Sequence, residues 1–180
     1  MRRKEFIDII LNSISDTFDI YHNYWFEERK FVIYAYNYKN KNKFETTGDA
    51  KLWDSRCFEH LFFINSDNLG MEEFDDLVDF AVNKIEPHFV RNDKKLPCKN
   101  HMYSYISFII ITRNMPSEDV IAKLKNCNPG KNYLFGARGY CHIRLVCVTP
   151  RQYSVISNKY GDNISEFLME MMLHIDHFED

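Results

Sequence analysis

The 180-residue chain lacks long hydrophobic runs, an excess of basic charge and a familiar catalytic signature. Its longest apolar stretch, around residues 106–111, is about a third of the length that spans a bilayer, which excludes membrane insertion but leaves peripheral attachment open. With a formal charge of −3, the chain has no general attraction for phosphate backbones, so nucleic-acid binding would need a local basic patch. Nucleophile-elbow, dinucleotide-binding and kinase motifs are missing, which argues against the common enzyme families.

Disulfide pairing and export signals are also not evident. The five cysteines are odd in number, and Cys57, Cys141 and Cys147 lie within strand-like apolar runs, which predicts buried free thiols in a reducing cytosol. The N-terminus is basic, but Asp8 and Asn12 interrupt the apolar residues that follow, so no signal-peptide core forms. We therefore expect a cytoplasmic protein.

What the chain does have is material for a large core. Hydrophobic residues make up 45% and aromatic residues 16% of the sequence, the opposite of the composition of disordered chains. The length falls in the usual range for one domain. We expect residues 1–180 to form a single globular domain.

The first half of the chain predicts a helix followed by strands. Apolar residues at three- and four-residue steps over 3–21 are typical of an amphipathic helix. Residues 31–38, 44–47 and 57–64 have strand composition, and the polar run 39–43 has turn composition. Because tight turns join antiparallel strands, these three strands should form an antiparallel meander.

The second half alternates helices and strands. A clean helical stripe covers 69–86, with Asn68 as the expected N-cap and Pro87 as the expected stop. The remaining elements are a strand over 102–112, a helix around Val120, strands over 141–149 and 153–157, and a C-terminal helix that begins at Asp162 or Asn163. The order αβββαβαββα predicts an α/β (α+β) fold, in which helices cover a mixed sheet and a parallel crossover passes through the helix near Val120.

This order resembles the core of the restriction-endonuclease-like nucleases over residues 3–112. That resemblance implies two carboxylates that hold Mg²⁺ and a lysine that helps to activate water. Asp49 and Glu59 are the candidate catalytic acids. The expected lysine is missing, because Leu61 stands two residues after Glu59. Lys51 lies on the wrong side of the strand to replace it.

The alternation of side chains along a strand has two further consequences for residues 57–64. Cys57, Glu59 and Leu61 should point to one face and His60 to the other, so His60 cannot serve as a base beside Glu59. An acid in so apolar a strand is costly to bury without a partner, and Arg138 or Arg144 would suit. No set of Cys and His residues reaches the ligand count of a metal site, so we predict none.

The segment 135–140 is a second place where chemistry could reside. Its two glycines, Gly136 and Gly139, flank Arg138 and allow close approach of the backbone to an anion, with Lys131 and Arg144 nearby. The alternative interpretation is a plain turn, which is commoner for this spacing, and the motif lacks the Lys-Ser/Thr of a P-loop. Both interpretations remain open.

Residues 105–112, 132–140 and 143–148 resemble a family of uncharacterised proteins from anaerobic Gram-positive bacteria, within the segment 100–160. This resemblance implies only a domain of unknown function, and no cofactor follows from it. We favour a non-enzymatic binding domain whose exposed aromatic residues, such as Tyr36, Tyr38 and Trp53, contact a protein or a small molecule. The alternative is a divergent Mg²⁺-dependent nuclease, with nucleic acid as its partner.

Overall fold

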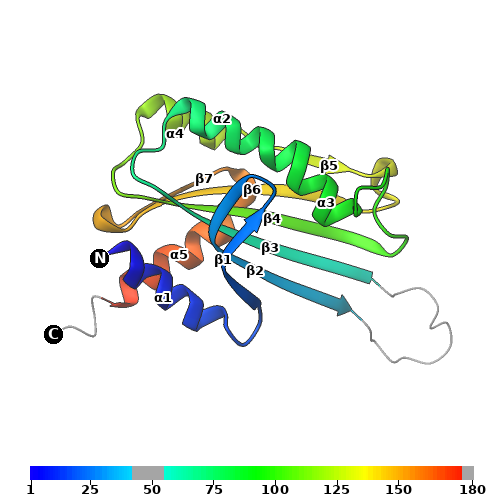
Figure 1. Ribbon diagram of the computed structural model, residues 1–180, viewed down its shortest axis with the longest axis horizontal. Coiled ribbons are helices and arrows are strands. Elements are labelled where there is room, and N and C mark those ends of the chain that lie inside the picture. The colour runs from blue at the N-terminus through cyan, green and yellow to red at the C-terminus, as the bar shows by residue number, and fades with distance from the viewer. Residues whose placement is uncertain (42–54, 176–180) are drawn as a thin grey trace.

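The protein folds into a mixed seven-stranded sheet with helices on both faces (Figure 1). This is a computed structural model, and the structure describes residues 1–41 and 55–175. The strand order is β1-β2-β3-β4-β6-β5, and β7 also pairs with β6. The strands are β1 (Asp19–Phe26), β2 (Arg29–Lys41), β3 (Ser55–Ser66), β4 (His101–Thr112), β5 (Gly130–Asn132), β6 (Tyr140–Thr149) and β7 (Ser154–Ser157). The predicted fold class is confirmed.

The pairing directions follow from the connections. Strands β1, β2 and β3 form an antiparallel meander, whereas β3 pairs with β4 and β4 with β6 in parallel. The parallel pairing of β4 and β6 across the helix at Val120 confirms the predicted crossover. β3 lies between β2 and β4, which confirms that this doubly apolar segment is a central strand.

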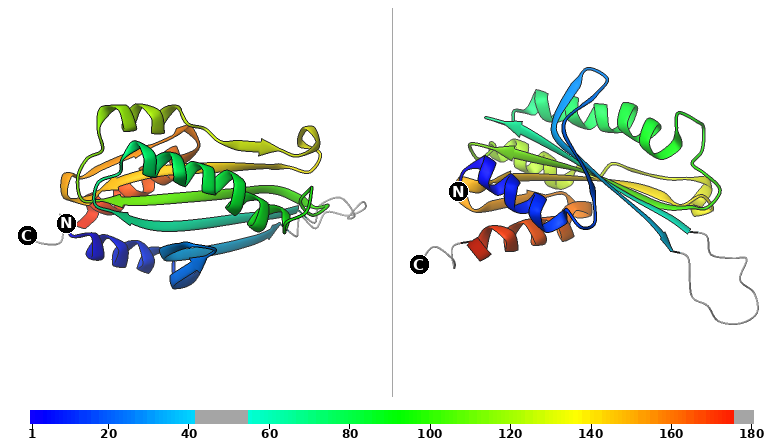
Figure 2. Two further views of the ribbon diagram at one scale, coloured as in Figure 1. Left: turned by 45° about the horizontal axis from the view of Figure 1, so that its top comes forward. Right: turned by 60° about the horizontal axis from the view of Figure 1, so that its bottom comes forward.

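Two layers of helices cover the sheet (Figure 2). The helices α1 (Arg3–Ile14) and α5 (Asp162–Ile175) lie against one face, where Phe6 and Met172 are fully buried with Phe63 and Val146. On the other face, α2 (Met71–Phe80), α3 (Glu86–Arg91) and α4 (Glu118–Asn126) cover a second core. Among the described residues, no helix is long and apolar enough to cross a membrane.

The predicted helix over 3–21 is wrong in its second half. The helix ends at Ile14, and Tyr21 belongs to the edge strand β1, which the sequence interpretation missed. Ring contacts favour a strand over a helix here, because Tyr21 and Tyr24 pack on Tyr34 of β2 at centroid distances of 5.7 and 4.6 Å. β1 is thus the first strand of the meander, while the predicted strand 44–47 lies outside the described residues.

The predicted boundaries of the helix over 69–86 also need correction. The N-cap is Gly70 instead of Asn68, and Pro87 does not stop the helix. Instead, α2 passes through a π-helical turn, η1 (Ala81–Ile85), and continues as α3. Pro87 lies in the first turn of α3, where its missing N–H is tolerated.

Candidate functional site

The helices α1 and α5 lie under one end of the sheet, and the strands extend beyond them at the other end (Figure 2). Cross-strand pairing there places polar and aromatic side chains in rows on the same face as Glu59. We call this surface the open face, because no described helix covers it. It comprises the rows Lys39–Cys57–Tyr103–Tyr140 and Asn37–Glu59–Tyr105–His142, together with Ser107 and Arg144. The other members of the row of Ser107 and Arg144, Ala35 and Leu61, belong to the core under α1 and α5.

Aromatic rings dominate the open face. Tyr103 and Tyr105 lie 4.6 Å apart between ring centroids, and the hydroxyls of Tyr105 and Tyr140 are hydrogen-bonded at 3.0 Å. His142 stacks on Tyr160 at 3.9 Å. Burial and the hydrogen bond with Tyr105 raise the pKa of Tyr140 to about 12, so its hydroxyl stays protonated at neutral pH. These half-buried rings form a surface that is apolar but carries hydroxyl groups.

Glu59 and Arg144 form an ion pair in the middle of this surface. An Nη1–Oε1 distance of 3.6 Å separates them, and the side chains are 27% and 11% exposed, respectively. The Arg144 guanidinium also lies over the Tyr105 ring, at 3.5 Å from its centroid. Burial lowers the pKa of Arg144, and Glu59 opposes this shift. Of the two partners that the sequence suggested for Glu59, Arg138 and Arg144, the structure shows Arg144.

Three buried polar atoms of the open face have no hydrogen-bond partner among the described residues. They are Nδ2 of Asn37, Oγ of Ser107 and Nε of Arg144. Such groups are uncommon in native proteins, since each costs about 1–3 kcal/mol to leave unpaired. The amide and the guanidinium are donors, and a hydroxyl can also donate. The open face therefore has unused capacity for a partner that offers oxygen acceptors.

Of the predicted catalytic pair the structure describes Glu59, and it divides the predicted anion site between the two faces of the sheet. Asp49 lies outside the described residues. Lys131 of β5 binds Glu86 on the face covered by α3, whereas Arg144 pairs with Glu59 on the opposite face. Lys131 and Arg144 are thus not brought together.

Gly136, Arg138 and Gly139 lie in the turn 133–139, and hydrogen bonds within the turn use their amides. Arg138 N–H donates to Tyr133 O at 3.0 Å, and Gly139 N–H donates to Gly136 O at 2.9 Å. Gly139 has a φ of +71°, and a Cβ there would lie 2.1 Å from the Met102 carbonyl oxygen. The conformation therefore requires glycine. The internal bonding favours the plain-turn interpretation, and anion binding stays a prediction.

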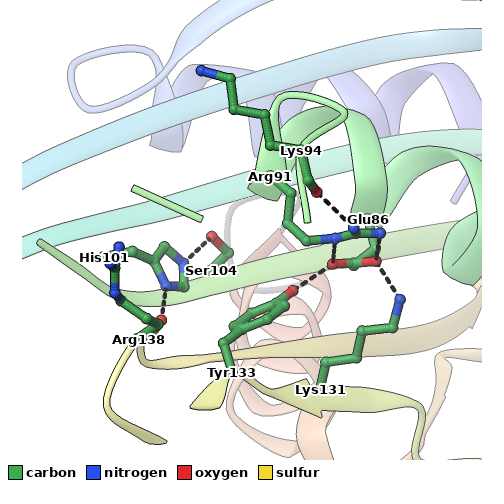
Figure 3. Close-up of polar contacts among 8 residues, drawn as sticks. All are labelled: Glu86, Arg91, Lys94, His101, Ser104, Lys131, Tyr133 and Arg138. Atoms are coloured by element: carbon green, nitrogen blue, oxygen red, sulfur yellow. Dashed lines mark hydrogen bonds and ion pairs between the residues drawn. The ribbon is translucent and has the colours of Figure 1, made fainter. Parts of the chain in front are cut away.

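The sequence interpretation missed a polar cluster under α3, shown in Figure 3. Glu86 is 1% exposed and accepts hydrogen bonds from Arg91 Nε at 2.8 Å and Arg91 Nη2 at 3.1 Å. Lys131 Nζ and the Tyr133 hydroxyl donate to the same carboxylate. A cavity of about 150 Å³ lies beside the cluster, between Val82 and Lys131. The carboxylate thus joins α3 to the β5 segment.

Electrostatics explain how Glu86 stays ionised in the core. Burial acts to raise its pKa, but the hydrogen bonds from Arg91, Lys131 and Tyr133 outweigh burial, and the pKa is lowered overall. The π-helical turn positions the group, because the Glu86 amide bonds to Ala81 O instead of a residue four back. A sequence signal did exist: Pro87 inside a helical pattern also fits a helix that changes its pitch.

The fold and the open face define an α+β domain with a mixed sheet that its helices cover only in part. The chain belongs to the family described as Domain of unknown function (DUF8052), which matches residues 2–170. The match confirms the resemblance to an uncharacterised family and extends it well beyond residues 100–160. No curated protein and no solved structure matches the chain significantly.

Proposed function

We propose that the protein is a non-enzymatic binding domain that takes a small molecule or a segment of a protein on its open face. The observation that carries this proposal is the group of unpartnered buried atoms on one tyrosine-rich surface: Ser107 and Arg144 are cross-strand partners, and Asn37 is the cross-strand partner of Glu59. Few polar groups that fix orientation, set among aromatic rings, are typical of ligand sites. The ligand supplies oxygen acceptors and an apolar surface.

Two of the aromatic residues named from the sequence lie elsewhere. Tyr36 contacts His60 at a centroid distance of 5.1 Å and Tyr38 contacts Phe58 at 5.2 Å, both on the opposite face of β2 and β3. Trp53 lies outside the described residues. Tyr103 and Tyr105 therefore replace them as the aromatic residues that we expect to contact the ligand.

Protein-detected NMR of the isotope-labelled chain tests the binding function with three sets of probes: small carboxylates, phosphate esters and neutral polyols. We expect probes with oxygen acceptors to bind and to shift the amide signals of Glu59, Tyr105 and Arg144. Asn37→Ala should weaken these probes about tenfold, because one hydrogen bond contributes on the order of 1 kcal/mol. Ser154→Ala on β7 is the matched control. The proposal would be contradicted if the affinity of the probes did not change in Asn37→Ala and the probes shifted only amide signals outside the open face.

The alternative of a metal-dependent nuclease has weaker support. Its helix, meander and parallel strand are in the expected order, but Glu59 is already balanced by Arg144, which reduces its attraction for Mg²⁺. Calorimetric titration with Mg²⁺ and Mn²⁺ separates the two functions. We expect equal heats from the native protein and from Glu59→Gln. Heat released only by the native protein would favour the nuclease.

We also propose a reducing compartment, the cytoplasm, for this binding domain. Cys57, Cys141 and Cys147 are free and buried, as the sequence predicted. Burial raises the pKa of Cys147 to about 11, so this thiol is unreactive at neutral pH. Free thiols of this kind are typical of proteins in reducing surroundings.

A further inference from the structure

Two loops at the same end of the sheet form a surface with unusual chemistry (Figure 1). The loop 92–100 connects α3 to β4, and the turn 133–139 precedes β6. Arg138 Nη1 donates to Pro97 O at 3.3 Å and so joins the two loops, and His101 Nδ1, at the start of β4, donates to Arg138 O at 2.8 Å. We call these two loops, together with Met102, the basic tip.

Charge is concentrated at the basic tip. Lys94, Lys95 and Lys99 are exposed, and Arg138 is half-buried, while Asp93 is the single acid of the two loops. The tip thus carries a formal charge of +3 in a chain whose formal charge is −3. Such a polarised distribution orients a protein toward an anionic surface.

Apolar side chains project from the same tip. Phe135 is fully exposed, and Leu134 and Met102 are 49% and 42% exposed. Leu134 and Phe135 both have left-handed backbone conformations, with φ of +49° and +52°, which cost non-glycine residues free energy. The fold therefore holds an aromatic ring in water at a local cost in backbone free energy.

The backbone of the turn is suited to a medium without water. Besides Arg138 and Gly139, the amides of Tyr133, Gly136 and Ala137 donate to carbonyls within the turn, at 3.0–3.1 Å. Backbone groups that enter a lipid layer must be bonded internally, because an unpaired group there costs several kcal/mol as a general rule. The five bonded amides flank Leu134 and Phe135, so most of the turn's N–H groups are already paired where it approaches the lipid.

We propose that the basic tip attaches the protein peripherally to anionic lipid surfaces, with Leu134 and Phe135 inserted at the level of the headgroups. The lysines of the tip are attracted to lipid phosphates, and the apolar residues add hydrophobic burial. Lipid fits better than nucleic acid, because a polyanion would not explain the exposed Phe135. It also fits better than a protein pocket, because cations surround the apolar summit.

Vesicle co-sedimentation of the full chain tests this proposal. We expect binding to vesicles of phosphatidylcholine and phosphatidylglycerol in equal parts, little binding to phosphatidylcholine alone, and weaker binding at high salt. Phe135→Ser should reduce the partition constant about tenfold. Lys94→Ala combined with Lys95→Ala should reduce it on the order of twentyfold, since each cation contributes roughly fivefold. Equal binding to both vesicle types would overturn the proposal.

Matched variants exclude indirect effects. Trp25→Ser, at another exposed aromatic residue, and Lys4→Ala, at an exposed cation on α1, should leave binding unchanged. Ser107→Ala should also bind normally, which separates this tip from the open face. Should the lysine variant lose binding while Phe135→Ser keeps it, the partner would be a polyanion such as nucleic acid, and lipid insertion would be wrong.

A second measurement reports the depth of insertion. In Phe135→Trp, a brominated phosphatidylcholine mixed with phosphatidylglycerol should quench the new indole more strongly than the native tryptophans. Quenching equal to that of the native protein would place the tip outside the lipid and overturn the insertion.

Discussion

Glu86 and Glu59 lie on opposite faces of one sheet and differ in how their charge is balanced. Glu86 is sealed in the core, and three side chains donate to its two oxygens. Glu59 is partly exposed and has Arg144 at 3.6 Å, beyond hydrogen-bonding distance. A carboxylate with every lone pair in use joins elements of the fold, whereas one with unused capacity, beside unpartnered donors, is available to a ligand. Glu86 therefore has a structural role, whereas the surroundings of Glu59 support the proposal that the open face binds a ligand.

The largest expected effect comes from Glu86→Gln. The change removes the charge that Arg91 and Lys131 neutralise, while both cations stay close together. We expect the free energy of unfolding in urea to fall by about 2–3 kcal/mol, because hydrogen bonds between charged groups are lost in a buried site. Arg91 and Lys131 are both partly exposed and can be rehydrated in the variant. The loss in free energy of unfolding should therefore be smaller than the loss seen when one partner of a fully buried ion pair is removed.

Glu59→Gln is the control for this comparison. Its ion pair is partly exposed, so the free energy of unfolding should change by less than about 1 kcal/mol. Equal losses from the two variants would mean that both carboxylates serve the fold, and the assignment of the open face to binding would lose its support.

A second, smaller effect concerns His60, the chain neighbour of Glu59 on the opposite face. Its Nδ1 bonds to the Tyr34 hydroxyl at 2.9 Å, and burial lowers its pKa to about 3. The folded protein therefore binds fewer protons than the unfolded chain between about pH 3 and pH 6.5. His60 makes its full contribution to stability above pH 6.5 and loses it progressively as the pH falls. Between pH 7 and pH 5 the loss is about 2 kcal/mol.

The measurement is urea unfolding at both pH values for the native protein and for His60→Gln. The glutamine keeps a polar partner for Tyr34 but does not titrate, so the variant should lose about 2 kcal/mol less than the native protein on acidification. Identical pH dependence in the two proteins would show that His60 takes up a proton in the folded protein as readily as in the unfolded chain.

The two carboxylates also show which features the sequence can predict. The two-residue period of β3 correctly separates Glu59 from His60, and the cost of burying an acid correctly predicts an arginine partner, although it leaves Arg138 and Arg144 as alternatives. Both inferences need only the local geometry of a strand and the general free-energy cost of burying an unpaired charge. Cross-strand rows such as Glu59–Tyr105–His142 depend on strand order, which no local pattern specifies.

The misses have the same origin. Glu86 accepts hydrogen bonds from two residues that are distant in the sequence: Lys131, 45 residues further along, and Tyr133, 47 residues further along. Its neighbour Pro87 also suggests a helix end at this point. At the N-terminus, Phe18 satisfies a helical spacing and packs against the core of α1 and α5 from outside the helix. In both places a tertiary contact overrides the local pattern.

The smallest expected effect sharpens the assignment of the open face. The Ser107 hydroxyl is buried and unpartnered, so Ser107→Ala removes an unpaired polar group without removing a hydrogen bond. We expect the free energy of unfolding to stay unchanged or to rise by up to about 1 kcal/mol. The measurement is urea unfolding, with Ser104→Ala as the control, because Ser104 bonds His101 at 2.8 Å and should lose stability. If Ser107→Ala is more stable but binds oxygen-acceptor probes less well, the Ser107 hydroxyl serves ligand binding at a cost in stability. If the variant is less stable, Ser107 has a structural role, as Glu86 has.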